Sequence, residues 1–306
     1  MIADVVLRPG RRLRYAPPMP ELLRLAAFTT DPSGGNPAGV WLGDAFPPDD
    51  EMQAIAAAVG YSETAFLVPD PAAGHDLMAR RVRYFSQVAE VAFCGHATIA
   101  AGVALAPRTG PGRYRLTTNE GEVPLDVQRA EDGGHVATLT SVDPRVDTAS
   151  PMLLSEALGA LDWTERVLDP ALPPEVAYAG VSHLILAVSS YAALAGMRYD
   201  FERMRAAMLA AGMTTIQIVW REARDRYRAR DPFPVGGVVE DPATGAAAAA
   251  LGAYLRAHDE LPPDGRLTVL QGVEMGRPSR LQVEVPGPTG GIRVSGRAVV
   301  LDGVER

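Results

Sequence analysis

Short runs in which apolar and polar residues alternate occur along most of the chain. Alternation with a period of two, rich in β-branched residues, is typical of half-buried strands, and the Gly, Pro, Asp and Asn clusters between the runs are typical of turns. The pattern predicts strands at residues 25–29, 65–68, 82–85, 114–118, 123–127, 216–220 and 281–285.

Helical stretches are fewer than strands, and two of them stand out. The candidates are residues 48–59, 97–105, 153–159, 201–210 and 244–258, of which the second and the last are the strongest. Many short strands with one strong helix in each half predict an α+β fold. We expect two similar halves, each a curled sheet wrapped around a central helix.

Three pairs of similar segments occur in the same order and indicate an internal duplication. The pairs are 61–68 with 181–188, 95–98 with 241–245, and 115–127 with 266–285. The first pair matches His183 to Glu63, which predicts a site with one working carboxylate rather than two.

The duplication and the composition together suggest the domain limits. A chain of 306 residues exceeds the usual size of one domain. We place the halves at residues 21–145 and 146–291, joined within 141–150, with the last strand, about 292–306, completing the first half. Residues 1–20 are rich in Arg and Pro and are expected to be a disordered extension.

Composition and charge exclude several classes of protein. The net charge of −8 disfavours nucleic-acid and membrane-surface partners, and no apolar run is long enough to span a bilayer. The chain contains no lysine, which excludes a pyridoxal-phosphate Schiff base and a Walker-A phosphate loop. Cys94 is the only cysteine, so no intramolecular disulfide forms and a reducing cytoplasm is expected.

Motifs for metals and common cofactors are absent from the sequence. There is no HExxH, no paired cysteines and no Asp-rich loop, so we expect no metal site. The glycines at 34, 35 and 39 do not fit the dinucleotide-binding pattern, and Gly-x-Ser-x-Gly is missing. The motifs therefore indicate neither a dinucleotide site nor the common serine-hydrolase nucleophile.

Two turns that precede the strongest helices are candidates for an anion site. One is Phe93-Cys94-Gly95-His96-Ala97-Thr98 and the other is Glu240-Asp241-Pro242-Ala243-Thr244-Gly245-Ala246. The unpaired N–H groups and the dipole of a helix N-terminus bind anions without a basic side chain. The alternative is that Asp241, Thr98 and Thr244 only cap the helices.

Glu63 and His96 are the candidate acid/base residues. Glu63 begins an apolar strand, where a carboxylate is costly unless it is hydrogen-bonded or protonated. Such a carboxylate suits proton abstraction next to a carbonyl or imine. His96 lies at a predicted helix start, where the dipole favours a neutral imidazole. The alternatives are a surface glutamate and a structural histidine.

Five motifs, in order, resemble the phenazine-biosynthesis PhzF-like family, which belongs to the diaminopimelate-epimerase fold superfamily. They run from about residue 22 to the C-terminus. The motifs are Phe28-Thr29 with Gly35-Asn36-Pro37-Ala38-Gly39-Val40, then Ser62-Glu63-Thr64-Ala65-Phe66, Gly95-His96-Ala97-Thr98, Glu240-Asp241-Pro242-Ala243-Thr244-Gly245, and Gln271-Gly272 with Met275-Gly276-Arg277-Pro278-Ser279.

The resemblance implies a fold and an activity. The fold would be two pseudo-symmetric halves, each a mainly antiparallel, barrel-like sheet around a central helix, with the active site between them. The protein would be a homodimer that uses no cofactor or metal. The activity would be isomerisation of trans-2,3-dihydro-3-hydroxyanthranilate or a similar small anionic metabolite.

The resemblance also implies roles for residues. Glu63 would move the proton, with His96 and Asp241 as supporting catalytic residues. Many members have serine where this chain has Ala246, so one polar contact to the substrate is expected to be missing. The expected substrate-binding residues are Ser62, Gly95, Ala97, Thr98, Thr244, Gly245 and Ala246.

Cys94 and His183 are further possible site residues, and Cys94 leaves a second reading open. Racemases of the same superfamily use two opposed cysteines, but here the second place is held by Asp241, which excludes a two-thiol racemase. A thiol at a helix N-terminus is expected to have a lowered pKa. An epimerase, racemase or dehydratase in which Cys94 participates therefore stays open, as does a non-catalytic binding protein of the same family.

Overall fold

The computed structural model describes residues 20–119 and 121–301. Within them, strands enclose or support six α-helices. Most of the extension expected over residues 1–20, and the last residues of the strand expected at 292–306, lie outside this part of the chain. The strands are β1 (Glu21–Ala27), β2 (Asn36–Leu42), β3 (Glu63–Pro69), β4 (Ala79–Ser86), β5 (Glu90–Val91), β6 (Gly112–Thr118), β7 (Gly121–Arg129), β8 (His135–Thr140), β9 (Arg145–Thr148), β10 (Glu175–Tyr178), β11 (Ser182–Ala187), β12 (Thr215–Ala223), β13 (Arg226–Pro232), β14 (Glu240–Asp241), β15 (Arg266–Gln271), β16 (Ser279–Glu284) and β17 (Arg293–Val300). The helices are α1 (Asp49–Val59), α2 (Gly95–Thr109), α3 (Pro151–Ala160), α4 (Tyr191–Ala195), α5 (Phe201–Ala211) and α6 (Gly245–Ala257).

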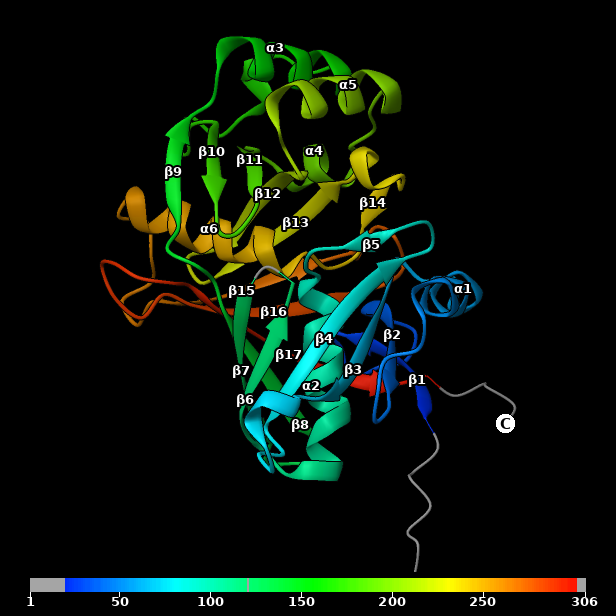
Figure 1. Cartoon of the computed structure of the whole chain (residues 1–306). Helices are drawn as coiled ribbons and strands as arrows, with labels where there is room; N and C mark the ends of the chain where they lie inside the picture. Colours follow the sequence, from blue (N-terminus) through cyan, green and yellow to red (C-terminus); the bar gives the residue numbers. More distant parts are fainter. Residues whose placement is uncertain (1–19, 120, 302–306) are drawn as a thin grey trace, which may run out of the picture.

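Eight strands of the first half close into a barrel around α2 (Figure 1). The ring of pairings runs β1–β2–β3–β4–β6–β7–β8–β17 and returns to β1. Helix α2 is buried over most of its length, with Ile99 and Leu105 in the main core. A helix that is apolar on all sides needs such an enclosure.

The second half repeats the same order of pairings around α6. Strands β10, β11, β12, β13, β15 and β16 pair in the same sequence and orientation as β1, β2, β3, β4, β6 and β7. Strand β17 then pairs with β16 as well as with β1 and β8, so it belongs to both sheets. The α+β prediction of two curled sheets, each around a central helix, is confirmed.

The pairings correct the alignment of the two halves. Strand β11, which contains His183, has the pairings of β2, whereas the counterpart of β3 is β12. The match of 61–68 with 181–188 was therefore wrong, because apolar strands on one face of a sheet resemble one another in sequence. The match of 95–98 with 241–245 had the wrong register as well. Helices α2 and α6 begin at Gly95 and Gly245, which makes those two glycines equivalent.

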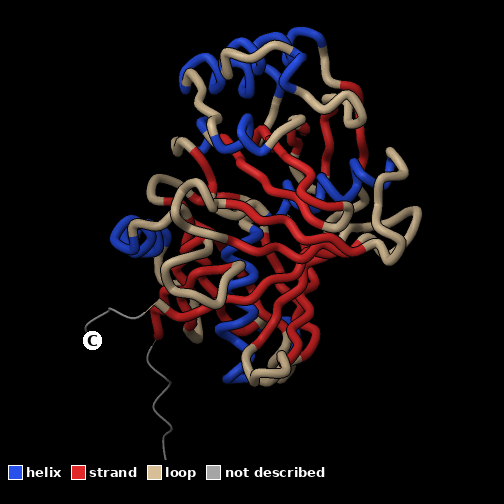
Figure 2. Tube along the Cα trace, turned by 180° about the vertical axis from the view of Figure 1, so that it is seen from behind, coloured by secondary structure: helices blue, strands red, loops and turns tan. Residues whose placement is uncertain are grey.

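The remaining helices cover the outside of the sheets. Helix α1 packs on β3 and β4 through a small core that includes Met52 and Phe66. Helices α3, α4 and α5 lie over the second sheet, at the top of Figure 1, around Met204 and Met208. Figure 2 shows from behind that strands run through the middle of the molecule and connect its lower and upper parts.

Two further points bear on the predictions from sequence. The segment 141–150, expected to join the halves without an apolar repeat, contains β9, which pairs with β10. The limits of the two halves stay a prediction. Among the described residues, no helix is long and apolar enough to cross a membrane.

Candidate active site

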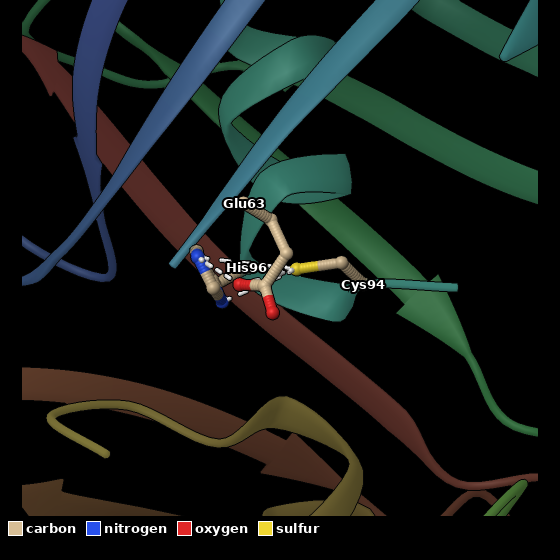
Figure 3. Close-up of side chains that lie close together, drawn as sticks. All are labelled: Glu63, Cys94 and His96. Carbon is tan, nitrogen blue, oxygen red and sulfur yellow. Dashed lines mark hydrogen bonds and ion pairs between the residues drawn. The ribbon is translucent and has the colours of Figure 1, made fainter. Parts of the chain in front are cut away.

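Three side chains from two segments meet where α2 begins. Glu63 is the first residue of β3, Cys94 is the residue before α2, and His96 lies in its first turn. The Cys94 Sγ lies 3.5 Å from Glu63 Oε2 and 3.4 Å from His96 Nδ1, and His96 Nε2 lies 3.5 Å from Glu63 Oε2. Figure 3 shows the three side chains converging on one point.

Burial of this cluster is high but not complete. The side chains of Glu63 and His96 are 16% and 7% exposed, so the carboxylate keeps some access to solvent. Ser62, the residue before the strand, places its Oγ 3.4 Å from His96 Nε2. The predicted grouping of Glu63, His96, Cys94 and Ser62 is therefore a compact set of polar groups.

Asp241 reaches the same place from the other half and is held in a fixed orientation. Its two carboxylate oxygens accept hydrogen bonds from Asn36 Nδ2 at 2.7 Å and from Thr244 Oγ1 at 2.6 Å. Gln271 donates to the Asp241 carbonyl at 2.7 Å and accepts from the Thr244 N–H at 3.1 Å. The Asp241 carboxylate and the Thr244 side chain thus both have partners, which holds the carboxylate in one position.

Electrostatic coupling joins Asp241 to the Glu63 cluster. Burial raises the pKa of Asp241 to about 6, the neighbouring His96 opposes this shift, and the negative charge of Glu63 adds to it. Asp241 consequently changes charge just below neutral pH, within the range useful for acid/base chemistry.

The thiol of Cys94 is protonated, contrary to the expectation from its helix position. Burial raises its pKa well above the ordinary value, and the charges of Glu63 and Asp241 raise it further. The N–H of Ala97 lowers it, but by less. The helix terminus alone would favour a thiolate, and burial, with two carboxylates adding to it, reverses that effect.

Neither α2 nor α6 has a side-chain oxygen as its N-terminal cap. Thr244, in the cap position of α6, accepts no hydrogen bond from the helix. Cys94, in the cap position of α2, has only its sulfur near the Ala97 N–H, and neither first turn contains an acidic residue. The outer helices α3 and α5 differ, because Ser150 and Asp200 cap them. The capping alternative for Asp241, Thr98 and Thr244 is therefore wrong, and the free N–H groups suit an anionic ligand.

Some of the other predicted site residues lie at the helix starts, and others lie in the hydrophobic core. Gly245 and Ala246 form the first turn of α6, beside Thr244. Ala97 and Thr98 are buried inside the first barrel, where Thr98 Oγ1 contacts Tyr84 Oη and the Cys94 carbonyl, both at 2.6 Å. Their side chains serve the helix rather than a ligand.

His183 lies in the sheet of the second half and forms its hydrogen bond outside the cluster. It is fully buried on β11, and its Nδ1 lies 2.8 Å from Thr215 Oγ1. Burial lowers the pKa of His183 to about 3, so the imidazole is neutral. By pairing order, Thr215 at the start of β12 is the counterpart of Glu63 at the start of β3.

Sequence reasoning did not assign roles to three further residues. Asn36 and Gln271 lie within the motifs that carried the family resemblance, and that position was the available signal. Asp231, opposite Asp241 in the pairing of β13 with β14, is fully buried, and neither carboxyl oxygen has a hydrogen-bond partner among the described residues. Nothing in its local sequence marks it.

Comparison with known proteins identifies the family of the chain. Residues 25–303 match the model of the PhzC-PhzF family, described as phenazine biosynthesis-like protein. The chain belongs to this family. An uncharacterized isomerase of Deinococcus radiodurans is 33% identical, with 90% of each chain covered.

Two further relatives are informative. The trans-2,3-dihydro-3-hydroxyanthranilate isomerase of Pseudomonas aeruginosa is 32% identical over 88% of this chain and 91% of that protein. The crystal structure of a phenazine biosynthesis protein of the PhzF family from Bacillus anthracis superposes with a TM-score of 0.79 at 26% identity. It covers 92% of this chain and 96% of its own.

Proposed function

We propose that this protein, an isomerase of the PhzF-like family, moves a proton and with it a double bond in a small anionic hydroxy- or amino-acid-like substrate. The substrate is of the trans-2,3-dihydro-3-hydroxyanthranilate type. Glu63 takes the proton from one carbon and returns it to another. No metal or organic cofactor is needed for this step.

The position of Glu63 carries the proposal. Its carboxylate is partly buried, contacts His96 and Cys94, and keeps access to solvent, as a group that exchanges protons with a ligand requires. His96 contacts the Glu63 carboxylate and also interacts electrostatically with Asp241. It can donate a hydrogen bond to the substrate and stabilise the charge left on Glu63 or on an enolate.

The N-termini of α2 and α6 would bind the anionic part of the substrate. The first-turn N–H groups of α2 and α6 are available to a carboxylate and to a developing negative charge. This explains how a protein with net charge −8 and no lysine binds an anion. Asn36 and Thr244 keep Asp241 from taking the same N–H groups.

Cys94 is the observation behind the second candidate, an epimerase, racemase or dehydratase. Its thiol donates toward Glu63 Oε2 at 3.5 Å and could pass a proton to it. The raised pKa of Cys94 opposes a role as base, and Thr244 holds the equivalent place before α6. We therefore assign the base to Glu63 and keep Cys94 as a neutral neighbour.

The test is isotope exchange in D₂O, followed by NMR. Trans-2,3-dihydro-3-hydroxyanthranilate and related β,γ-unsaturated and hydroxy acids are incubated with the enzyme. We expect deuterium uptake with a double-bond shift. In Glu63→Gln the exchange rate should fall by about 10²- to 10⁴-fold, the usual contribution of one acid/base group.

Controls separate catalysis from folding and binding. Calorimetric affinity for the same acids should be retained in Glu63→Gln, and Glu131→Gln, on an exposed turn, should exchange at the normal rate. Undiminished exchange in Glu63→Gln would remove Glu63 as the base. Inversion of a stereocentre, lost in Cys94→Ala, would favour the epimerase reading.

A further inference from the structure

We propose that Glu63, Cys94 and His96 form a binding site for a soft divalent transition-metal ion, best matched by Zn²⁺, and that this ion inhibits the enzyme. The inhibition rests on the proposed function, because it removes the base. The metal site itself does not, since it follows from the geometry of three side chains.

The spacing of the three ligand atoms carries the inference. Glu63 Oε2, Cys94 Sγ and His96 Nε2 form a triangle with edges of 3.5, 3.5 and 3.9 Å. Tetrahedral Zn²⁺, with Zn–S near 2.3 Å and Zn–N and Zn–O near 2.1 Å, requires ligand separations of about 3.4–3.6 Å. Small rotations of side chains therefore place all three atoms on one ion.

The chemical types of the ligands favour the same kind of ion. A thiolate and an imidazole bind Zn²⁺, Co²⁺ and related ions in preference to Mg²⁺ or Ca²⁺, which take oxygen ligands. Three protein ligands leave the fourth tetrahedral position to water, an arrangement in which the ion stays exchangeable. The partial exposure of Glu63 gives the ion a route in.

Metal binding by Cys94 requires its thiolate form. When the ion binds, the Cys94 S–H bond breaks, a Zn–S bond forms and the proton leaves to solvent, with no change of oxidation state.

Inhibition follows from occupation of the ligands. Coordination would tie Glu63 Oε2 and a His96 ring nitrogen to the ion, and the positive charge of the ion would make the Glu63 carboxylate a much weaker base for a substrate proton. The ion would thus act as a reversible block, and a chelator would restore activity.

The single cysteine makes the site testable by spectroscopy. Co²⁺ is titrated into the full-length protein, and the near-ultraviolet thiolate-to-Co²⁺ charge-transfer band is followed. Because Cys94 is the only cysteine of the 306 residues, this band can arise from no other side chain. We expect one Co²⁺ per chain, displaced by Zn²⁺ and not by Mg²⁺.

Variants test each ligand. Cys94→Ser should abolish the band, and His96→Ala and Glu63→Gln should each weaken Co²⁺ binding by at least about 10-fold, the lower limit seen even for loss of an outer-shell partner. His75→Ala, which removes an exposed histidine, is the matched control and should bind normally. Circular dichroism verifies that each variant is folded.

Two results would overturn the inference. One is the absence of the band at a stoichiometric excess of Co²⁺, and the other is an unchanged band in both His96→Ala and Glu63→Gln. Metal binding is read without substrate, so failure of the proposed reaction leaves this test intact. Conversely, exchange activity that depends on Glu63 but is unaffected by bound Zn²⁺ would refute the proposed inhibition and leave the metal site standing.

Discussion

Asp231 shows how one residue can set the response of the whole fold to pH. Burial raises its pKa well above the ordinary value of 3.8, and the charges of Asp241 and Glu240 add to this shift. Thr244 and Gln271 favour the ionised form but do not offset burial. The folded protein therefore holds a proton on Asp231 that the unfolded chain releases above about pH 4.

The sign of this linkage gives a prediction for Asp231→Asn. A raised pKa in the folded state makes the wild-type stability fall as pH rises above the unfolded value, by up to about 1.4 kcal/mol per pH unit. The asparagine variant lacks this loss and should become more stable than wild type between pH 5 and 8. Urea unfolding across that range measures the difference.

Asp143→Asn is the matched control, because Asp143 is exposed and its replacement should leave the slope unchanged. If Asp231→Asn and wild type lose stability in parallel as pH rises, Asp231 is not the group whose pKa is raised in the folded state. Sequence alone gave no reason to single out this residue, since its burial depends on strands that pair only in the fold.

At the scale of elements, two glycines let the central helices sit inside their sheets. Gly102 of α2 and Gly252 of α6 each follow the first residue of their helix by seven positions. A methyl group at Gly102 would meet Leu125 Cδ2 at 2.7 Å, and one at Gly252 would meet Val283 and Ile292 at 3.0 Å. The equivalent glycines support the duplication in its corrected register.

Gly102→Ala is therefore expected to destabilise the protein although alanine is the better helix former. Alanine gains about 1 kcal/mol of helix propensity, whereas overpacking of a filled core typically costs about 1–3 kcal/mol. We expect a net loss of about 1 kcal/mol in the free energy of unfolding, measured by urea denaturation.

Gly287→Ala serves as the control for Gly102→Ala. Its added methyl group would meet no atom within 4 Å, so its effect on stability should be small. A Gly102→Ala protein as stable as wild type would show that the barrel expands around α2 without cost. The sequence predicted this helix but could not predict how closely the strands approach it.

At the scale of the whole molecule, the two halves are bonded to each other at the site. Asn36 of the first half donates to Asp241 Oδ1 and to the Ala243 carbonyl at 3.0 Å. Arg277 of the second half donates to the carbonyls of Gly34 and Gly35. The charge state of Asp241 therefore depends on a residue more than two hundred positions away.

Asn36→Ala should move the pH dependence of the enzyme. The Asn36 hydrogen bond lowers the pKa of Asp241, so its loss should raise that pKa above about 6. We expect activity to require the ionised form of Asp241, which holds His96 in place. The acidic limb of the kcat/KM profile should then move to higher pH by about one unit, equivalent to one hydrogen bond of about 1 kcal/mol.

The measurement is the pH–rate profile with any substrate found by isotope exchange. Asn119→Ala, which removes an asparagine–carboxylate bond to Glu90 outside the site, is the control and should leave the profile in place. A uniform loss of rate at every pH in Asn36→Ala would indicate a structural role without coupling to Asp241.

The sequence alone predicted the class of fold, the two central helices and the residues that meet at the candidate site. Periodicity located the central helices and strands such as β3, β4 and β7, because burial of one face is a local pattern, but it missed longer strands such as β2, β8 and β13. Family motifs marked Glu63, His96 and Asp241, and the missing lysines removed whole classes of chemistry. Two-residue strands such as β5 and β14 carry too few residues to show a period.

The alignment of the halves, the protonation of Cys94 and the surroundings of Asp231 and His183 depend on the tertiary structure. Strand pairing is set by contacts distant in sequence, so apolar strands were matched to the wrong partners. The pKa of Cys94 is likewise raised by burial and by two carboxylates from other elements. Those charges and the depth of burial exist only once the two halves have folded against each other.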